Sequence, residues 1–197
     1  MSEIYQSKWV QSELPANLIK EAVREFDNKL TDNLSPATIA DANYEGGGYI
    51  NTKQRDAKTA WITDTHWMSG VILNALNIIN QENFQFDLFH GFSGHSTQYT
   101  VYGKDNFFKW HCDDDIYVPK PNPSIIRKLS VSLQLSEPDE YEGGELQLQD
   151  TTGRVYTAPK ERGLIIVFDS RARHRVRPIK RGVRKSLVGW VNGPRWK

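Results

Sequence analysis

Two histidines and an aspartate in the second half of the chain are the residue types best suited to hold a transition metal. His111 and Asp113 are one residue apart, and His174 follows much later in the sequence. Alternate residues of a strand point to the same face, so His111 and Asp113 can contact one ion together. Two imidazoles and one carboxylate form the facial arrangement that suits ferrous iron and leaves coordination positions open. A His-x-Asp pair alone is a weak sign, because such pairs also occur in surface loops.

The neighbours of this pair leave some ambiguity about the ligands. Asp115 would share the face of Asp113, whereas Cys112 should point away from the ion by strand alternation. The remaining histidines lack the context of this cluster, and we interpret them as surface or hydrogen-bonded structural residues: His66, His90 and His95.

Arg184 is a second candidate functional residue, ten residues after His174. A turn region with Pro178 and Gly182 would let two antiparallel strands pair and bring Arg184 near the metal, with Ser186 on the same face. A buried guanidinium is costly without an anion, and its planar fork matches a carboxylate. The distal carboxylate of 2-oxoglutarate would satisfy it. The alternative is an ordinary surface arginine on a strand.

The elements that must position these residues are short strands behind a more helical first third. Apolar spacing predicts helices over 14–30, introduced by Pro15, and over 67–79, capped by Thr65 or Asp64, with a loop at 33–48. Alternating or continuous apolar runs predict strands at 84–89, 98–102, 129–135, 144–149, 164–168 and 186–191. Leu129, Val131, Leu133 and Leu135 should share one face, and 164–168 should be buried on both faces.

This pattern predicts a mainly β fold with flanking helices, a double-stranded β-helix or jelly roll. We expect one domain over 1–197, with a helical support at about 1–83 and the jelly-roll core at about 84–192. The chain has 197 residues, 38% of them hydrophobic, and a single cysteine. One cysteine excludes an internal disulfide framework and fits a reducing compartment. Without a signal-like or membrane-spanning apolar run, we expect a cytoplasmic protein with no membrane partner.

Charge is unevenly distributed although the net charge is only +1. The stretch 171–185 holds eight basic residues and no acid, whereas 137–150 holds six acids and no base. A basic stretch can bind nucleic acid. Because the whole molecule is nearly neutral, we favour solvated strand faces with one or two buried functional arginines.

Several motifs together resemble the prolyl 4-hydroxylase-like family of iron and 2-oxoglutarate dioxygenases. His111-x-Asp113, His174 and Arg184 look like the site of that family. The stretch 127–146 is similar to the segment between the two iron-binding strands in its bacterial and phage branch, and His174-x-Val176-x-Pro178 resembles its closing motif. The resemblance covers about residues 84–192 and agrees in motif order and spacing.

The resemblance implies a role for each matching residue. His111, Asp113 and His174 would bind Fe(II), and Arg184 would bind 2-oxoglutarate with Ser186 as a possible helper. Three further positions match residues that contact the co-substrate (Tyr102) or line the peptide pocket (Arg127 and Trp190). O2 is the second co-substrate, and an ascorbate dependence is implied. Collagen-type prolyl hydroxylases usually carry lysine where this chain has Arg184, which weakens any inference of a collagen-like substrate.

The leading functional hypothesis is therefore hydroxylation of a prolyl residue in a proline-containing peptide or protein. A second hypothesis with the same chemistry is an oxygenase of a free amino acid or small metabolite. A third, from another class, is a nucleic-acid demethylase or binding protein that uses 171–185. A non-catalytic jelly-roll binding module is a fourth, which the complete triad and Arg184 argue against. Polar segments 44–60 and 114–124 are the candidates for a loop that closes over the substrate.

Overall fold

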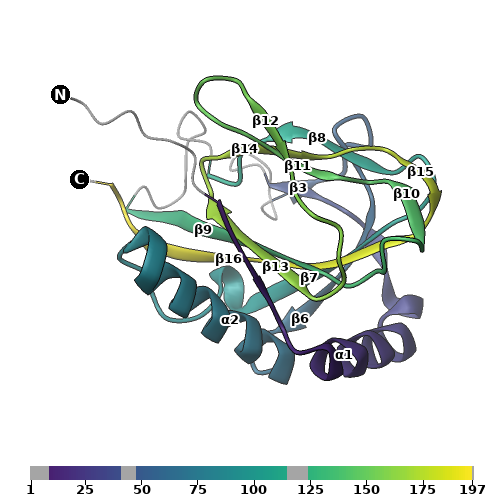
Figure 1. Ribbon diagram of the computed structural model, residues 1–197, viewed down its shortest axis with the longest axis horizontal. Coiled ribbons are helices and arrows are strands. Elements are labelled where there is room, and N and C mark those ends of the chain that lie inside the picture. Colours follow the sequence, from purple (N-terminus) through teal and green to yellow (C-terminus); the bar gives the residue numbers. More distant parts are fainter. Residues whose placement is uncertain (1–8, 41–47, 115–123, 197) are drawn as a thin grey trace.

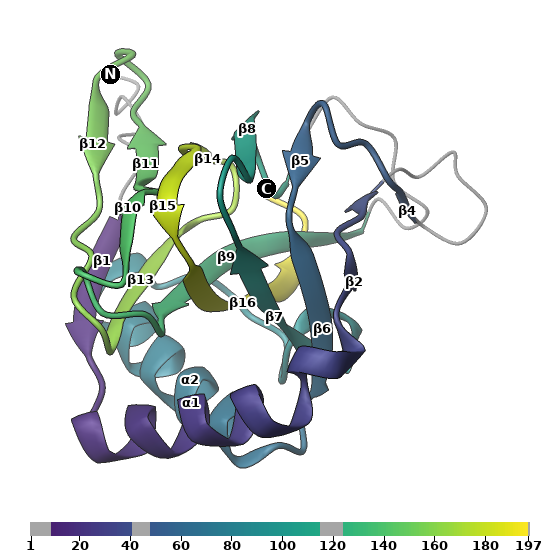
Figure 2. The same ribbon diagram turned by 90° about the vertical axis from the view of Figure 1, so that its right-hand side faces the viewer.

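A computed structural model describes residues 9–40, 48–114 and 124–196. Two antiparallel sheets face each other, and two helices cover the outer face of the larger one (Figures 1 and 2). This is the mainly β architecture with flanking helices that the sequence predicts. Outside the described residues lie Asp115, residues 44–47 of the proposed lid segment 44–60, and residues 115–123 of the segment 114–124.

The larger sheet has seven strands in the order β1-β13-β9-β16-β7-β6-β2. Its central strand β16 pairs with β7 on one side and β9 on the other. These members are β1 (Trp9–Glu13), β13 (Leu164–Asp169), β9 (Ile125–Gln134), β16 (Arg184–Pro194), β7 (Ser96–Tyr102), β6 (Lys58–Thr63) and β2 (Ser35–Pro36).

The smaller sheet has five strands in the order β12-β11-β14-β8-β5. They are β12 (Val155–Thr157), β11 (Leu146–Gln149), β14 (Arg173–Val176), β8 (Phe107–His111) and β5 (Arg55–Asp56). Two separate ribbons complete the β structure: β10 (Tyr141–Gly143) with β15 (Ile179–Gly182), and β3 (Ile39–Ala40) with β4 (Gly48–Tyr49).

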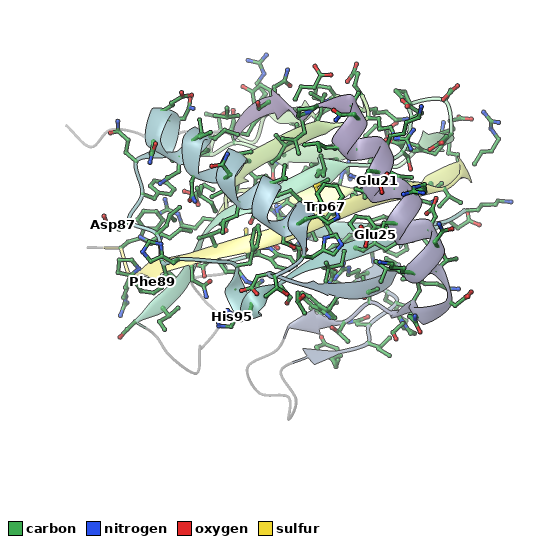
Figure 3. All side chains as sticks on the ribbon, turned by 90° about the horizontal axis from the view of Figure 1, so that it is seen from below. Glu21, Glu25, Trp67, Asp87, Phe89 and His95 are labelled. Carbon is green, nitrogen blue, oxygen red and sulfur yellow. The ribbon has the colours of Figure 1, made fainter. Side chains whose placement is uncertain are left out.

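Helices α1 (Ala16–Lys29) and α2 (Trp67–Ile79) match the two predicted helices closely. Pro15 precedes α1 as expected. The cap of α2 is His66 rather than Thr65 or Asp64, because its Nδ1 accepts the backbone N–H of Met68 at 3.2 Å. Seen from the helical side, Glu25 of α1 lies beside Trp67, whose Nε1 donates to its carboxylate at 2.8 Å (Figure 3). The two helices are thus joined at the start of α2. The remaining helical segments are short: Thr31–Asn33, Asn80–Phe84 and Ser93–His95.

Two apolar cores follow from the alternation of the strands. Leu129, Val131, Leu133 and Leu135 are all buried in the core between the larger sheet and the helices. Their serine and glutamine neighbours on β9 line the space between the sheets. Strand β13 contributes to both cores, with Ile165 and Val167 on the helical side and Ile166 and Phe168 between the sheets. The predicted faces of both strands are therefore confirmed.

Two sequence-based expectations about the first half of the chain are wrong. Residues 84–89 do not form a strand, since the helical segment Asn80–Phe84 leads into irregular backbone. The first third supplies strands as well as helices, because β1, β2 and β6 join the larger sheet and β5 joins the smaller one. Among the described residues, no helix is long and apolar enough to cross a membrane.

Candidate metal centre

Pairing of β8 with β14 places the two histidines side by side. His174 is the register partner of His111, and their ring centroids are 4.1 Å apart. Asp113 does not extend this strand, as the spacing had suggested, because β8 ends at His111. Its place is instead fixed by its backbone N–H, which donates to the carbonyl of Ser170 at 2.9 Å. A loop contact, rather than strand alternation, brings the carboxylate to the histidines.

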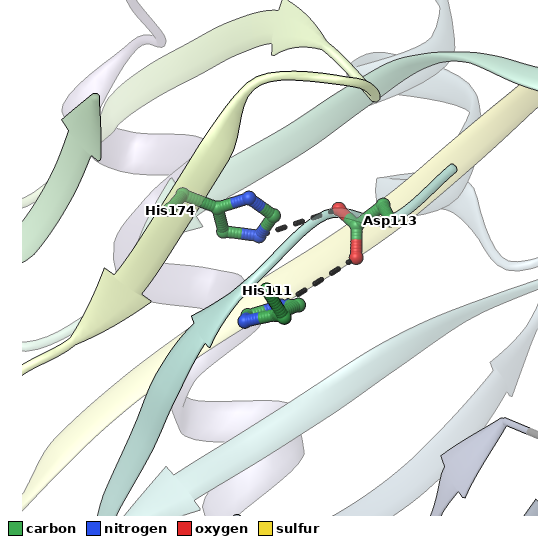
Figure 4. A group of neighbouring side chains, drawn as sticks. All are labelled: His111, Asp113 and His174. Carbon is green, nitrogen blue, oxygen red and sulfur yellow. Dashed lines mark ion pairs between the residues drawn. The ribbon is translucent and has the colours of Figure 1, made fainter. Parts of the chain in front are cut away.

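The three side chains converge on one point between the sheets (Figure 4). The Nε2 atom of His111 lies 3.7 Å from Oδ1 of Asp113, and Nε2 of His174 lies 3.5 Å from Oδ2. All three candidate ligand atoms lie within 4.8 Å of one another. Among the described residues they are the single group of this kind, and neither Cys112 nor another histidine joins it.

The tautomers of the histidines favour a cation at this point. Nδ1 of His111 is 2.8 Å from the carbonyl of Lys109, and Nδ1 of His174 is 2.9 Å from that of Ala172. Each Nδ1 can therefore donate to a carbonyl, which leaves the Nε2 lone pair facing the carboxylate. Burial and the nearby His174 lower the pKa of His111 to about 3, so its ring is neutral at neutral pH. Two lone pairs and a carboxylate in such proximity fit Fe(II).

Asp113 is held as a carboxylate by its surroundings. Ser130 Oγ donates to its Oδ2 at 2.7 Å and is itself 2.9 Å from Ser170 Oγ. Burial alone would raise the pKa of Asp113, but His174, His111 and Arg127 outweigh it and lower the pKa to about 2. The hydrogen bond from Ser130 also fixes the direction of the carboxylate toward the histidines.

Arg184 reaches the same space from the larger sheet. It pairs with Tyr102 across β16 and β7, its guanidinium lies 5.6 Å from the centre of the Tyr102 ring, and its Nη1 donates to Ser186 Oγ at 3.2 Å. The predicted route is wrong, because β14 and β16 belong to different sheets and do not pair. The Arg184 side chain is buried, with an exposed fraction of 3%. Among the described residues, no carboxylate forms an ion pair with it.

A cavity that is open to solvent joins the histidines, Asp113 and Arg184. Ser186, Tyr102 and Trp190, which the sequence also singled out, line it. Its wall combines apolar and polar side chains from both sheets: Arg55, Thr100, Tyr102, Phe108, His111, Asp113, Val131, Ser132, Leu146, Phe168, His174, Val176, Arg184, Ser186, Val188 and Trp190. The buried Arg184 guanidinium, which has neutral partners in the wall of this cavity, can bind one carboxylate of a dicarboxylate ligand.

Arg127 lies beside the metal centre without lining the cavity itself. Its guanidinium stacks over the Trp190 ring at 4.4 Å, and its Nη1 donates to the carbonyl of Asp113 at 3.3 Å. Burial lowers the pKa of Arg127, while Asp113 and Asp114 oppose that shift. Arg127 and Trp190 are thus brought together next to a candidate metal ligand.

Sequence reasoning missed a stack that supports His111. The centres of the His111 and Phe108 rings lie 3.5 Å apart at an interplanar angle of 15°, and the guanidinium of Arg55 lies 4.8 Å from the centre of the Phe108 ring. Arg55 is buried and donates to Gln98 Oε1 at 2.6 Å. No local sequence signal marks Arg55, because β5 is only two residues long and approaches β8 through the fold.

The basic stretch does not form one surface. Arg184 is buried, Lys185 pairs with Asp27 of α1 at 2.6 Å, and two others pair with acids of the 137–150 segment. Those two pairs are Arg177 with Glu145 and Lys180 with Glu142. The uneven charge along the sequence is therefore partly neutralised in three dimensions.

The fold and the site together have the features of non-haem iron oxygenases with a two-histidine, one-carboxylate centre. Residues 97–192, just under half of the chain, match the model of the 2OG-Fe(II) oxygenase superfamily. This match agrees with the resemblance that the motifs carry, and the chemistry of that superfamily implies Fe(II), 2-oxoglutarate and O2.

The curated relatives are PKHD-type hydroxylases, and the similar solved structures include prolyl hydroxylases. A PKHD-type hydroxylase of Pseudomonas putida (strain W619) is 37% identical over 91 residues, which are 46% of this chain and 40% of that relative. The chain thus aligns with about two fifths of the length of such curated relatives.

Among solved structures, a Pseudomonas putida prolyl-4-hydroxylase aligns with a TM-score of 0.68 and 22% identity over 96% of this chain and 94% of that one. A Trichoplax adhaerens prolyl hydroxylase, solved with a hypoxia inducible factor peptide fragment, aligns with a TM-score of 0.72 and 17% identity over 93% and 82%. At these identities the structural matches confirm the fold.

Proposed function

We propose that this chain is a Fe(II)- and 2-oxoglutarate-dependent dioxygenase that hydroxylates a prolyl residue in a peptide or protein. The observation that carries the proposal is one cavity with a metal-type triad at one sheet and, on the facing sheet, a buried Arg184 that forms no ion pair with a carboxylate of the described residues. The PKHD-type hydroxylase relatives and the prolyl hydroxylase fold support the choice of a prolyl substrate.

In this proposal each part of the cavity has a separate task. His111, Asp113 and His174 hold Fe(II), and Arg184, with Ser186, binds the distal carboxylate of 2-oxoglutarate near Tyr102. Bound iron and co-substrate supply the oxidation, in which C–H becomes C–OH while 2-oxoglutarate and O2 yield succinate and CO2. The apolar wall, with Phe168, Val176 and Leu146, limits water around the reacting groups.

Two further parts of the proposal concern its setting. Ascorbate would restore iron that oxidises during turnover without substrate, as in related dioxygenases. The single cysteine is consistent with a reducing, cytoplasmic compartment. Arg127 and Trp190, which stack beside Asp113, are proposed contacts of the peptide substrate.

Production of succinate tests this function directly. Protein loaded with Fe(II) and 2-oxoglutarate without oxygen and then aerated should form succinate, faster when proline-rich peptides are added, and the peptides should gain one oxygen atom by mass spectrometry. His174→Ala should lose both Fe(II) binding and turnover. His95→Ala is the matched control, because His95 is 85% exposed on the helical side and contacts Asp64. Absence of succinate from the wild-type protein would rule the proposal out.

A further inference from the structure

A tryptophan outside the matched family segment lies beside Trp190, which lines the cavity. Trp61 of β6 exposes 55% of its surface, which is unusual for so large an apolar side chain. Its ring centroid lies 6.3 Å from that of Trp190, and Arg127 covers the same Trp190 ring at 4.4 Å. Arg127, Trp190 and Trp61 thus form a continuous row, here named the mouth row.

The strand register places the mouth row on the cavity face of the larger sheet. Trp61 is opposite Gln98, and Gln98 is opposite Val188, so their side chains share one face. Val188 and Trp190 line the cavity, which identifies that face. The row therefore crosses four neighbouring strands, β9, β16, β7 and β6, on this face.

The length of the row indicates what it can bind. Three steps between neighbouring strands, each about 4.8 Å, span roughly 14 Å. A polyproline II helix advances about 3.1 Å per residue, so this length matches roughly four to five residues of an extended chain. Flat aromatic faces suit proline rings, and grooves lined by aromatic side chains bind such segments in other proteins.

We infer that Trp61 is a substrate-binding residue that, with Trp190 and Arg127, holds an extended proline-containing segment across the cavity mouth. The inference rests on the proposed function and deepens it, because it makes the substrate a peptide of several residues rather than a free amino acid. Arg127 also donates to the carbonyl of Asp113, so a segment on the row lies next to the proposed iron ligands. Single-stranded nucleic acid can stack on aromatic side chains too, but the row carries one cation, which suits a neutral peptide better.

Calorimetric binding without oxygen, in the presence of Fe(II) and 2-oxoglutarate, tests the role of Trp61. The probes are hexaproline with both ends capped, free L-proline and an oligothymidylate. Trp61→Ala should weaken hexaproline binding roughly tenfold, as expected for loss of an aromatic anchor. Trp110→Ala is the matched control, because Trp110 lies against Arg175 at 4.6 Å and does not line the cavity. It should bind hexaproline as the wild type does.

The outcomes separate this inference from the proposed function. The role of Trp61 is overturned if the wild-type protein forms succinate but binds hexaproline no better than L-proline. It is also overturned if Trp61→Ala and the wild type bind hexaproline equally well. Tight oligothymidylate binding that requires Trp61, without hexaproline binding, also overturns it. If the protein forms no succinate but its hexaproline binding depends on Trp61, the peptide-binding role of the mouth row is supported and the proposed oxygenase function is rejected.

Discussion

At the scale of single residues, hydrogen bonds to neighbouring groups orient the metal-type triad. Each histidine directs Nδ1 to a backbone carbonyl two residues before it, at Lys109 and Ala172. Asp113 is oriented by Ser130, and its backbone by Ser170. Such supporting contacts set the direction and basicity of the ligands, so they affect metal affinity without touching the metal.

Ser130→Ala should therefore weaken Fe(II) binding by about 10–100-fold while leaving all three proposed ligands in place. The hydroxyl donates to Oδ2 of Asp113 at 2.7 Å, and without it the carboxylate loses one constraint on its direction. Titration calorimetry with Fe(II) in the absence of oxygen measures the effect.

Ser69→Ala is a suitable control, because Ser69 is equally buried and hydrogen-bonded but lies at α2, on the far side of the larger sheet. Equal Fe(II) affinities of wild type and Ser130→Ala would contradict the orienting role of Ser130.

At the scale of elements, glycines shape the ribbon of β10 and β15 that leads into Arg184. Gly182 has a φ of +79°, and a Cβ on it would lie 1.9 Å from the carbonyl oxygen of Glu140. Gly143 has a φ of +80°, and a Cβ on it would lie 2.3 Å from the carbonyl oxygen of Pro178. Both positions require glycine for conformation and for space.

Gly182→Ala should lower the free energy of unfolding by at least ~2 kcal/mol, from left-handed backbone strain and the clash with Glu140. Gly70→Ala should have the opposite effect on stability. Gly70 lies on the exposed side of α2, and a Cβ on it would have no atom within 4 Å. The substitution should raise stability by about 0.5–1 kcal/mol. Urea denaturation measures both changes, and a Gly182→Ala protein as stable as the wild type would refute the steric argument.

Local patterns predicted the elements whose burial is periodic, including both long helices and the faces of β9 and β13. Local patterns failed where contacts with residues elsewhere in the chain decide whether a segment forms a strand. The alternation at 84–89 correctly reports packing, since Phe84, Phe86 and Leu88 pack against the core on the helical side. No strand forms because the side chain of Asn80 hydrogen-bonds both the N–H and the carbonyl of Phe86 in place of a neighbouring strand.

The candidate site was predictable in its residues but not in its route of assembly. The residue types and spacing of His111, Asp113, His174 and Arg184 were informative, whereas strand order was not. A hairpin between His174 and Arg184 was the simplest local interpretation, but the two residues face each other from different sheets. Arg55 and Trp61 escaped detection because their importance arises from strands that meet only in the folded chain.

At the scale of the whole molecule, the cavity lies between two sheets that contribute opposite halves of the site. The histidines come from the smaller sheet, Asp113 from the loop after it, and Arg184 from the larger sheet. A metal held by the triad, with 2-oxoglutarate bound to both the metal and Arg184, would therefore connect the two sheets. Because such ligands bind the folded state alone, they should stabilise the entire fold.

Thermal unfolding without oxygen should show this connection. At 100 times its dissociation constant each ligand adds about 2.7 kcal/mol, which raises the melting temperature of a chain of this size by roughly 5–10 °C. The increase from 2-oxoglutarate should require Fe(II), since the co-substrate is proposed to bind both iron and Arg184. Arg184→Leu should keep the increase caused by Fe(II) and lose the increase caused by 2-oxoglutarate, whereas His174→Ala should lose both. If Arg184→Leu retained the full response to 2-oxoglutarate, another group would have to bind the distal carboxylate, and the two sheets would not be joined through this residue.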